Sequence, residues 1–365
     1  MQKATKIKYA FVANIIEDID IRMEGFYPIL GRMIPMFVWR AIYIIGALFG
    51  NGYRCVAEYD TFGRATGYSI LVTMTAKQMV SKPWAWLGRL STLRACRYAQ
   101  DVLKVDVIGL GSLTKSITNE GYYLKENGIS IPVTHGDAYS VASGLNGIEM
   151  MCKRFDLHPK TIAVVGAYGK IGRAMTKILA RKYDVIAMGR KEKLLEKLAN
   201  ETEQAIQITT DLKEALQGSQ LAVMATSAPY SIVDEVVLEK GKTYYLYDLG
   251  QPYNLFPDRY RDLVRKGYRI IRVDGGFEGT RKPFDIGFWM RLNPGVMYAC
   301  YAEVVTQALE GDLNDYLGPV DIGHVAETAR RAEKWGFNHQ PLSCFNRPLD
   351  EMLEKAKSHW KGRRS

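Results

Sequence analysis

Three glycines between residues 161 and 180 have the type and spacing to bind the phosphates of a dinucleotide. The stretch reads Thr161-Ile-Ala-Val-Val-Gly166-Ala-Tyr-Gly169-Lys-Ile-Gly172, and apolar residues then recur at helical spacing. The order is a buried strand, a glycine turn and a helix whose free N–H groups would face a pyrophosphate. A glycine-rich turn that binds nothing is the alternative. The predicted cofactor contacts are Gly166, Tyr168, Gly169, Lys170, Ile171 and Gly172.

The end of the next strand, Asp184–Met188, indicates which dinucleotide is bound. Proteins that prefer NADH place Asp or Glu there to bind the ribose 2′-hydroxyl, whereas this chain has Gly189, Arg190 and Lys191. Two cations suit a 2′-phosphate, because charge-assisted hydrogen bonds are strong. We therefore predict NADPH, with Arg190 and Lys191 at its phosphate. A solvated basic start to the following helix is the alternative.

Polar residues follow several later strands of the same region. In an open parallel sheet such strand ends line one crevice, where the ribose and nicotinamide would lie. The candidates from these strand ends are Thr226, Ser227, Asp248 and Gly275.

Two loops in the N-terminal part could bind a polar substrate group, because each follows a predicted strand and precedes a helix. A plain turn is the alternative for the first loop. In the second, His135 could act as a general acid or could simply be a hydrogen-bonded histidine. The candidates in the two loops are Gly111, Ser112 and Thr114, and Thr134, His135 and Gly136.

A late cysteine, Cys300, lies in a segment that we expect to be helical from Val296 to Leu309. In such a helix it shares a face with Val296 and Val304, which indicates packed surroundings. A buried helical cysteine is more often a packing residue than a nucleophile. The spacing alone leaves both roles open.

The elements that must position these residues alternate between strand and helix. They predict an α/β protein with a Rossmann-type, doubly wound parallel sheet domain, an α/β substrate domain and C-terminal helices. Residues 1–157 form the predicted substrate domain, 158–288 the NADPH-binding domain, and 289–365 a helical segment that carries Cys300. Within the first domain, Tyr53–Tyr59 and Ala65–Thr75 predict a hairpin.

Composition and charge limit the remaining possibilities. The net charge of +10 suits acidic partners without choosing among them, and we predict no nucleic-acid partner. Five scattered cysteines suggest neither a disulfide framework nor a metal site, and they favour a reduced, cytoplasmic protein. Residues 7–50 are unusually apolar but interrupted by charges. They predict helical core, a wall for an acyl chain or a peripheral membrane contact rather than a membrane span.

From about Val105 to Leu342 the chain resembles the long-chain fatty acyl-acyl carrier protein reductases, the aldehyde-forming enzymes best known in cyanobacteria. The similar segments are Gly109–Thr114, Val164–Gly172, Arg272–Gly276 and, most specifically, Met297-Tyr-Ala-Cys300-Tyr-Ala-Glu303. The family usually has Thr-Thr-Gly-Asn where this chain has Thr134-His135-Gly136-Asp137.

The resemblance implies that Cys300 is the catalytic nucleophile. As a thiolate it would attack an acyl thioester carried by acyl carrier protein or coenzyme A, and NADPH would reduce the acyl-enzyme to a fatty aldehyde. Oxyanion donors would come from the two N-terminal loops, and no metal is required. An aldehyde-consuming enzyme is then an expected partner.

Two other functions stay open. A shikimate-type NADP-dependent dehydrogenase of a small polyol or hydroxy acid would use Lys115 with Asp137 in place of the cysteine. A non-enzymatic NADPH-binding protein at a membrane surface would use residues 33–50 and the basic C-terminal tail.

Overall fold

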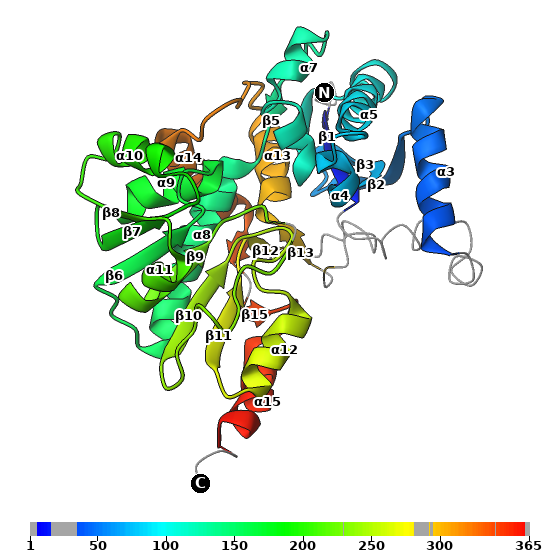
Figure 1. Cartoon of the computed structure of the whole chain (residues 1–365). Helices are drawn as coiled ribbons and strands as arrows, with labels where there is room; N and C mark the ends of the chain where they lie inside the picture. The colour runs from blue at the N-terminus through cyan, green and yellow to red at the C-terminus, as the bar shows by residue number, and fades with distance from the viewer. Residues whose placement is uncertain are drawn as a thin grey trace. The chain divides into compact units, whose positions relative to one another are not determined.

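A computed structural model describes most of the chain and divides it into two units (Figure 1). The described residues are 6–15, 35–228, 230–280, 292, 295–339 and 341–361. Unit 1 comprises residues 1–139, 278–319 and 327–338, and unit 2 comprises 140–277, 320–326 and 339–365. The predicted boundaries at 157/158 and 288/289 differ from this division, because residues 140–157 belong to unit 2 and the residues after 278 are shared between both units.

The sheet of unit 1 has five strands in the order β2-β3-β1-β4-β5. The hairpin prediction is confirmed, since β2 and β3 pair in antiparallel fashion, while β1, β3, β4 and β5 are parallel neighbours. The prediction of helical core was wrong for the first apolar run, because residues 7–15 form the central strand β1. Its neighbour Ile16, like Met33 and Ile34, lies outside the described residues. The bounds are β1 Ile7–Ile15, β2 Tyr53–Thr61, β3 Ala65–Thr75, β4 Val107–Leu110 and β5 Val133–Thr134.

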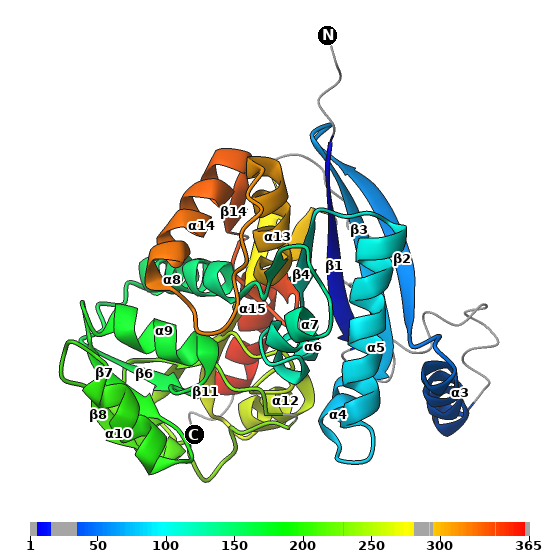
Figure 2. The same ribbon diagram turned by 90° about the horizontal axis from the view of Figure 1, so that it is seen from above.

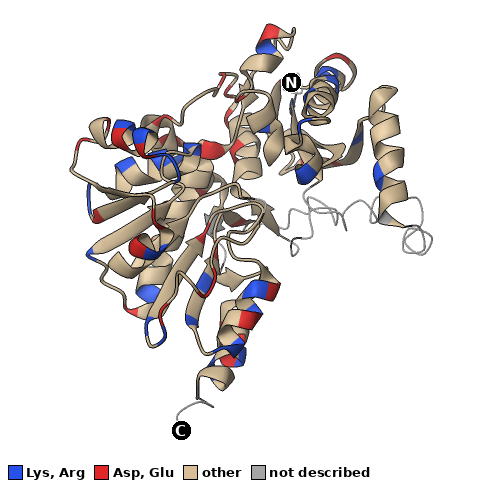
Figure 3. Ribbon diagram, viewed as in Figure 1, with Lys and Arg blue, Asp and Glu red and all other residues tan. Residues whose placement is uncertain are grey.

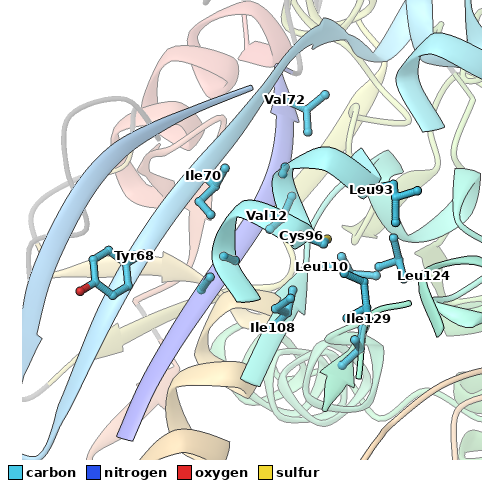
Figure 4. Close-up of a cluster of buried hydrophobic side chains, with 14 of the residues drawn as sticks. Val12, Tyr68, Ile70, Val72, Leu93, Cys96, Ile108, Leu110, Leu124 and Ile129 are labelled. Carbon is cyan, nitrogen blue, oxygen red and sulfur yellow. The ribbon is translucent and has the colours of Figure 1, made fainter. Parts of the chain in front are cut away.

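Helices cover both faces of this sheet, which explains why β1 is apolar on both sides (Figure 2). On one face, α5 packs over a core that includes Val12, Ile70 and Leu93 (Figure 4). On the other face, α13 packs so closely that a Cβ at Gly109 would lie 2.7 Å from Val304. The helices of this unit are α3 Met36–Leu48, α4 Ala76–Val80, α5 Ala85–Arg97 with a π-turn at Tyr98–Val102, α6 Leu113–Ile117, α7 Tyr122–Glu126 and α13 Ala299–Glu310.

The helix that carries Cys300 begins later than the sequence predicted. Val296–Tyr298 form strand β13, which joins β12 (Phe277–Thr280) and β14 (Phe337–His339) in a three-stranded sheet. Tyr298 is extended, with φ −71° and ψ 141°, and α13 starts at Ala299. Cys300 is consequently the second residue of its helix, and Val296 does not share a helical face with it.

Unit 2 contains the predicted Rossmann-type domain. Its six strands are all parallel and run in the order β11-β10-β9-β6-β7-β8, which is the dinucleotide-binding order read from the other edge. The fold-class prediction is confirmed. The strands are β6 Thr161–Val165, β7 Asp184–Met188, β8 Gln207–Thr209, β9 Leu221–Met224, β10 Thr243–Asp248 and β11 Arg269–Asp274, and the helices α9 Lys170–Leu179, α10 Glu192–Asn200, α11 Leu212–Gly218 and α12 Pro257–Arg265.

Two long helices have residues in both units, and the C-terminal residues add a hairpin and a helix. Helix α8 (Asp137–Phe155) begins in unit 1 and ends in unit 2, and α14 (Ile322–Trp335) also has residues in both. The C-terminal elements are β15 Ser343–Cys344, β16 Arg347–Pro348 and α15 Leu349–Lys361. In the described part of the chain, every helix is too short or too polar to cross a membrane.

Candidate functional site

The turn between β6 and α9 in unit 2 leaves no room for side chains. Gly166 has φ +86°, which favours glycine. A Cβ at Gly172 would lie 2.2 Å from the carbonyl oxygen of Gly166, and one at Gly169 would lie 3.0 Å from the same atom. Helix α9 starts here without a side-chain cap. The start of this helix can therefore approach a pyrophosphate closely, which fits a dinucleotide.

The residues after β7 fit a cofactor with an additional phosphate. The ring of Tyr168 lies over Gly189, where a Cβ would be 2.4 Å from a ring carbon. Arg190 and Lys191 follow directly and are exposed. A cationic pair at this strand end could bind a 2′-phosphate.

Thr226 and Ser227, the candidates after β9, differ in exposure and in hydrogen bonding. Thr226 is half-buried, and its hydroxyl donates a hydrogen bond to Oδ1 of Asn254. Ser227 is exposed beside it. The Thr226 hydroxyl is therefore engaged within unit 2, whereas Ser227 is open to a ligand.

Asp248, the candidate at the end of β10, belongs to a buried ion cluster. Its Oδ1 accepts a hydrogen bond from Nδ2 of Asn254 at 2.8 Å and from the N–H of Gly250 at 3.1 Å. Its Oδ2 accepts from Nε of Arg272 at 3.1 Å and from the N–H of Asn254 at 3.0 Å. Both oxygens are occupied, so we assign this carboxylate a structural role. Gly275 is also buried, and a Cβ there would lie 2.8 Å from Leu249.

Arg272 is the centre of this cluster, and the sequence did not suggest such a role. Its guanidinium is fully buried between the rings of Tyr253 and Phe345, at 4.4 and 4.2 Å from their centroids, and also pairs with Asp274. Burial alone would lower its pKa, but the two aspartates raise it. Asp274 in turn accepts hydrogen bonds from Ser343 at 2.7 Å and from the N–H of Asn346 at 2.8 Å.

In unit 1 the structure brings Lys115 and Asp137 into an ion pair. Lys115 lies in α6 after β4, and Asp137 is the first residue of α8 after β5, so two adjacent parallel strands position them. The side chain of Asp137 is 1% exposed and that of Lys115 is 16% exposed. Burial would lower the pKa of Lys115, but Asp137, Cys300 and Glu303 together raise it above the usual value. The lysine is therefore a cation at neutral pH.

The second oxygen of Asp137 keeps a free position. Its Oδ2 is buried and accepts no hydrogen bond from the residues that the structure describes. Nδ1 of the buried His135 is 3.3 Å away and accepts the N–H of Asp137 at 3.1 Å. A buried acceptor of this kind suits a ligand hydroxyl.

Cys300 lies against the same loop. A Cβ at Gly136, which has φ +72°, would be 2.5 Å from the Cβ of Cys300. The thiol is at a helix start, a position that favours a thiolate. Burial nevertheless raises its pKa to about 11; Lys115 opposes this rise, whereas Asp137 and Glu303 add to it. Cys300 is a neutral thiol at neutral pH.

Glu303 fixes the loop to α13. It is buried, its Oε1 accepts the hydroxyl of Thr134, and its Oε2 accepts the N–H of Tyr139 at 2.7 Å. Thr134 is thus engaged by Glu303 rather than free. Glu303 occurs in the segment that resembles the reductase family, but a positioning role was visible only in the fold.

The other candidate loop packs into the sheet. The Thr114 hydroxyl donates to the carbonyl of Gly111 at 2.7 Å, and the N–H of Gly111 donates to the carbonyl of Val12 at 2.9 Å. Ser112 is half-buried with φ +53°. Of these three candidates, only Ser112 has no hydrogen bond to β1 or within its loop among the described contacts. No group of His, Cys, Asp or Glu that could hold a metal ion occurs in the described ranges.

Residues 149–265 match the family model described as shikimate / quinate 5-dehydrogenase. The matched range contains β6 to β10 and lies within unit 2, so the similarity to this family concerns the nucleotide-binding domain. The lysine, aspartate and cysteine of unit 1 lie outside it. No curated protein sequence gives a significant match to the chain.

Solved structures give only distant similarities. L-tryptophan dehydrogenase from Nostoc punctiforme is 8% identical with a TM-score of 0.40, and the match covers 98% of this chain and 89% of that one. Shikimate 5-dehydrogenase from Thermus thermophilus, in complex with NADP(H) and shikimate, is 11% identical with a TM-score of 0.37, covering 89% and 99%. The nucleotide-binding domain of glutamyl-tRNA reductase from Thermoplasma volcanium is 22% identical with a TM-score of 0.27, covering 36% and 84%.

The family match of residues 149–265 favours the shikimate-type alternative of the sequence analysis over the acyl-acyl carrier protein reductase. The candidate site itself falls into two separate parts, with the nucleotide-binding turn in unit 2 and the Lys115, Asp137 and Cys300 cluster in unit 1. The predicted approach of Cys300 to the nicotinamide stays a prediction.

Proposed function

We propose that the protein is an NADPH-dependent oxidoreductase that binds the reacting oxygen of its substrate at Lys115 and Asp137. The observation that carries the proposal is the buried ion pair with a free position at Asp137 Oδ2. NADPH, when bound, would supply a hydride. The narrow glycine turn, the Arg190 and Lys191 pair and the matched family support this cofactor.

The charged state of Lys115 determines what it does. Because its pKa is raised, the ammonium group can donate a hydrogen bond to a carbonyl oxygen and a proton to the alkoxide that reduction forms. Asp137 holds this ammonium through Oδ1 and offers Oδ2 to a neighbouring hydroxyl group. The pair therefore polarises a carbonyl for reduction and, in the reverse direction, accepts the proton of an alcohol at high pH.

A small polyol or hydroxy acid is the first substrate class. The family match of the nucleotide-binding domain favours it, and a lysine and aspartate pair is sufficient for proton transfer at a carbinol. The free acceptor at Asp137 suits a substrate with more than one hydroxyl group. This class assigns Cys300 no chemical role.

An acyl thioester is the second class, and the position of Cys300 favours it. The thiol lies at a helix start, against Gly136, and Lys115 counteracts the rise of its pKa. The acyl group would pass to Cys300 Sγ while the carrier thiol leaves with the cysteine proton. Reduction of the acyl carbon would then break the carbon–sulfur bond, release an aldehyde and restore the thiolate. The substrate would be acyl-acyl carrier protein or acyl-CoA, and an aldehyde-consuming enzyme could take the product.

One experiment separates the two classes. Purified protein is incubated with NADPH and either a panel of ketone forms of polyols and hydroxy acids or a panel of acyl thioesters, and the products are identified by mass spectrometry. Lys115→Met should abolish turnover of either class. Cys300→Ala should abolish turnover of thioesters only, and Cys152→Ala, at another half-buried cysteine, is the matched control.

A covalent acyl group on Cys300 after incubation without NADPH would establish the thioester reaction directly. Turnover of a hydroxy acid that persists in Cys300→Ala would establish the dehydrogenase. If neither panel oxidises NADPH while NADPH still binds, the oxidoreductase proposal is wrong.

A further inference from the structure

Helix α3 carries an exposed face that is entirely apolar. Its outward side chains are large and show high exposed fractions: Phe37 71%, Ile42 48%, Ile45 53%, Leu48 45% and, directly after the helix, Phe49 83%. Scattered exposed apolar side chains are ordinary on protein surfaces, but a contiguous helical face of them indicates a contact with another apolar phase.

The opposite face already holds α3 in place. Tyr43 and Ala47 are buried, and Tyr43 packs with Ile15 and Leu71 of the sheet. Nη1 of Arg94 in α5 donates to the carbonyl of Ala47 at 2.9 Å. Among the described residues, the fold therefore packs against one side of the helix and leaves the other side exposed.

The charges that helices α3, α4 and α5 carry are of one sign. None of the helices α3, α4 and α5 contains an aspartate or a glutamate, and α5 contacts both of the others. Figure 3 shows α3 as tan except for the cation of Arg40. Exposed cations on or next to α4 include Lys77 and Lys82. An apolar helix face next to helices whose charged residues are all lysine or arginine complements an anionic lipid surface.

We propose that α3 lies in the headgroup layer of an anionic membrane, with Phe37, Ile45 and Phe49 inserted and the nearby cations at the lipid phosphates. A lipid surface accounts for both the unbroken apolar face and the excess of lysine and arginine. Protein interfaces, in contrast, are depleted in lysine. This contact would be peripheral, and it does not depend on the proposed oxidoreductase activity.

The test is co-sedimentation of the whole chain with phosphatidylcholine vesicles, with and without phosphatidylglycerol. We expect binding to the anionic vesicles that weakens as salt is added. The double variant Phe37→Ser/Ile45→Ser should weaken this binding by about tenfold or more. Lys77→Gln and Lys82→Gln should each weaken it by about fivefold. The control Val236→Ser/Leu313→Ser removes two exposed apolar side chains elsewhere and should leave binding unchanged.

Circular dichroism and NADPH binding establish that each variant is folded. Equal binding to neutral and anionic vesicles, or equal losses in the test and control doubles, would overturn the proposal. So would a dimer in the absence of lipid that becomes monomeric in Phe37→Ser/Ile45→Ser, because a second copy of the chain would then cover the face.

Discussion

Each unit of the protein buries an ion cluster at the ends of parallel strands, and the two clusters differ in how completely they are paired. In unit 2, Arg272 lies between two aromatic rings, and the carboxylates of Asp248 and Asp274 accept further hydrogen bonds from backbone and side chains. In unit 1, Lys115 is partly exposed and Asp137 keeps an oxygen without a hydrogen bond among the described residues.

This difference separates a structural cluster from a reactive one. A buried charge is costly unless it is paired and hydrogen-bonded, and the Arg272 cluster pairs its cation with two carboxylates while joining residues 343–346 to the strand ends. Among the described residues, its Nη2 lies 3.0 Å from Asp248 Oδ2 and is the one guanidinium nitrogen without a well-aligned hydrogen bond. In the Lys115 cluster, the lysine side chain is 16% exposed, and Oδ2 of Asp137 accepts no hydrogen bond from the described residues. Such incomplete pairing is tolerated where a ligand completes it.

The largest expected effect is on the cluster of Lys115 and Asp137 in unit 1. Lys115→Met should lower kcat by about 10³-fold, because it removes the proton donor. NADPH binding, measured by fluorescence, should change little. Lys125→Met removes a half-buried lysine that pairs with Asp315 at 2.8 Å in the same unit, and this control should retain activity. Similar losses in both variants would contradict the assignment of Lys115.

A substitution in the Arg272 cluster of unit 2 should lower the stability of the fold rather than the rate of the reaction. Arg272→Met leaves two buried aspartates without a cation and should lower the free energy of unfolding by about 3–5 kcal/mol. Arg259→Met removes a surface arginine that pairs with Asp262 at 3.2 Å, and it should cost at most about 1 kcal/mol. Urea unfolding of both variants tests this contrast, which fails if the two losses are equal.

The sequence predicted the unit 2 domain well because local signals there agree. Apolar strands, glycines at fixed spacing and amphipathic helices all indicate one parallel sheet, and the strand order follows from the connection rules. It assigned Asp248 to the cofactor because a polar residue at a strand end has that role in many such sheets. In the structure Asp248 pairs with Arg272 on the neighbouring strand, a pairing that spacing alone does not reveal, and its role at the cofactor stays a prediction.

The unit 1 site was predicted residue by residue but not as a cluster. Lys115 with Asp137 was weighed only as an alternative, and Cys300 was placed inside a helix that begins one residue before it. The error arose because Val296-Met-Tyr298 is equally apolar in helix or strand, and pairing with β12 decided for strand. Glu303 was missed as a positioning residue because both of its partners, Thr134 and Tyr139, are distant in sequence.

Arg190 and Lys191 of unit 2 are exposed, and they provide a third test of the comparison between paired and unpaired charges. Arg190→Ala removes an exposed cation that no described carboxylate holds, so folding should be unchanged while NADPH binding weakens by about tenfold to a hundredfold. NADH binding should stay the same, because NADH lacks the 2′-phosphate. Fluorescence titration with both cofactors is the measurement, and equal losses would refute the 2′-phosphate assignment. Lys193→Ala, at another exposed lysine of α10, is the control.

The smallest expected effect measures how Lys115 and Asp137 change the pKa of Cys300. With a pKa of about 11, Cys300 is protonated at neutral pH, so its alkylation by iodoacetamide should rise about tenfold per pH unit between pH ~8 and ~10. Asp137→Asn removes a negative neighbour, which lowers the pKa and should speed alkylation severalfold at fixed pH. Lys115→Met removes the positive neighbour and should slow it. Peptide mass spectrometry resolves the sites, with Cys152 as the internal reference. If neither variant changes the alkylation rate, the ion pair does not affect the pKa of Cys300, and the cluster consists of Lys115 and Asp137 alone.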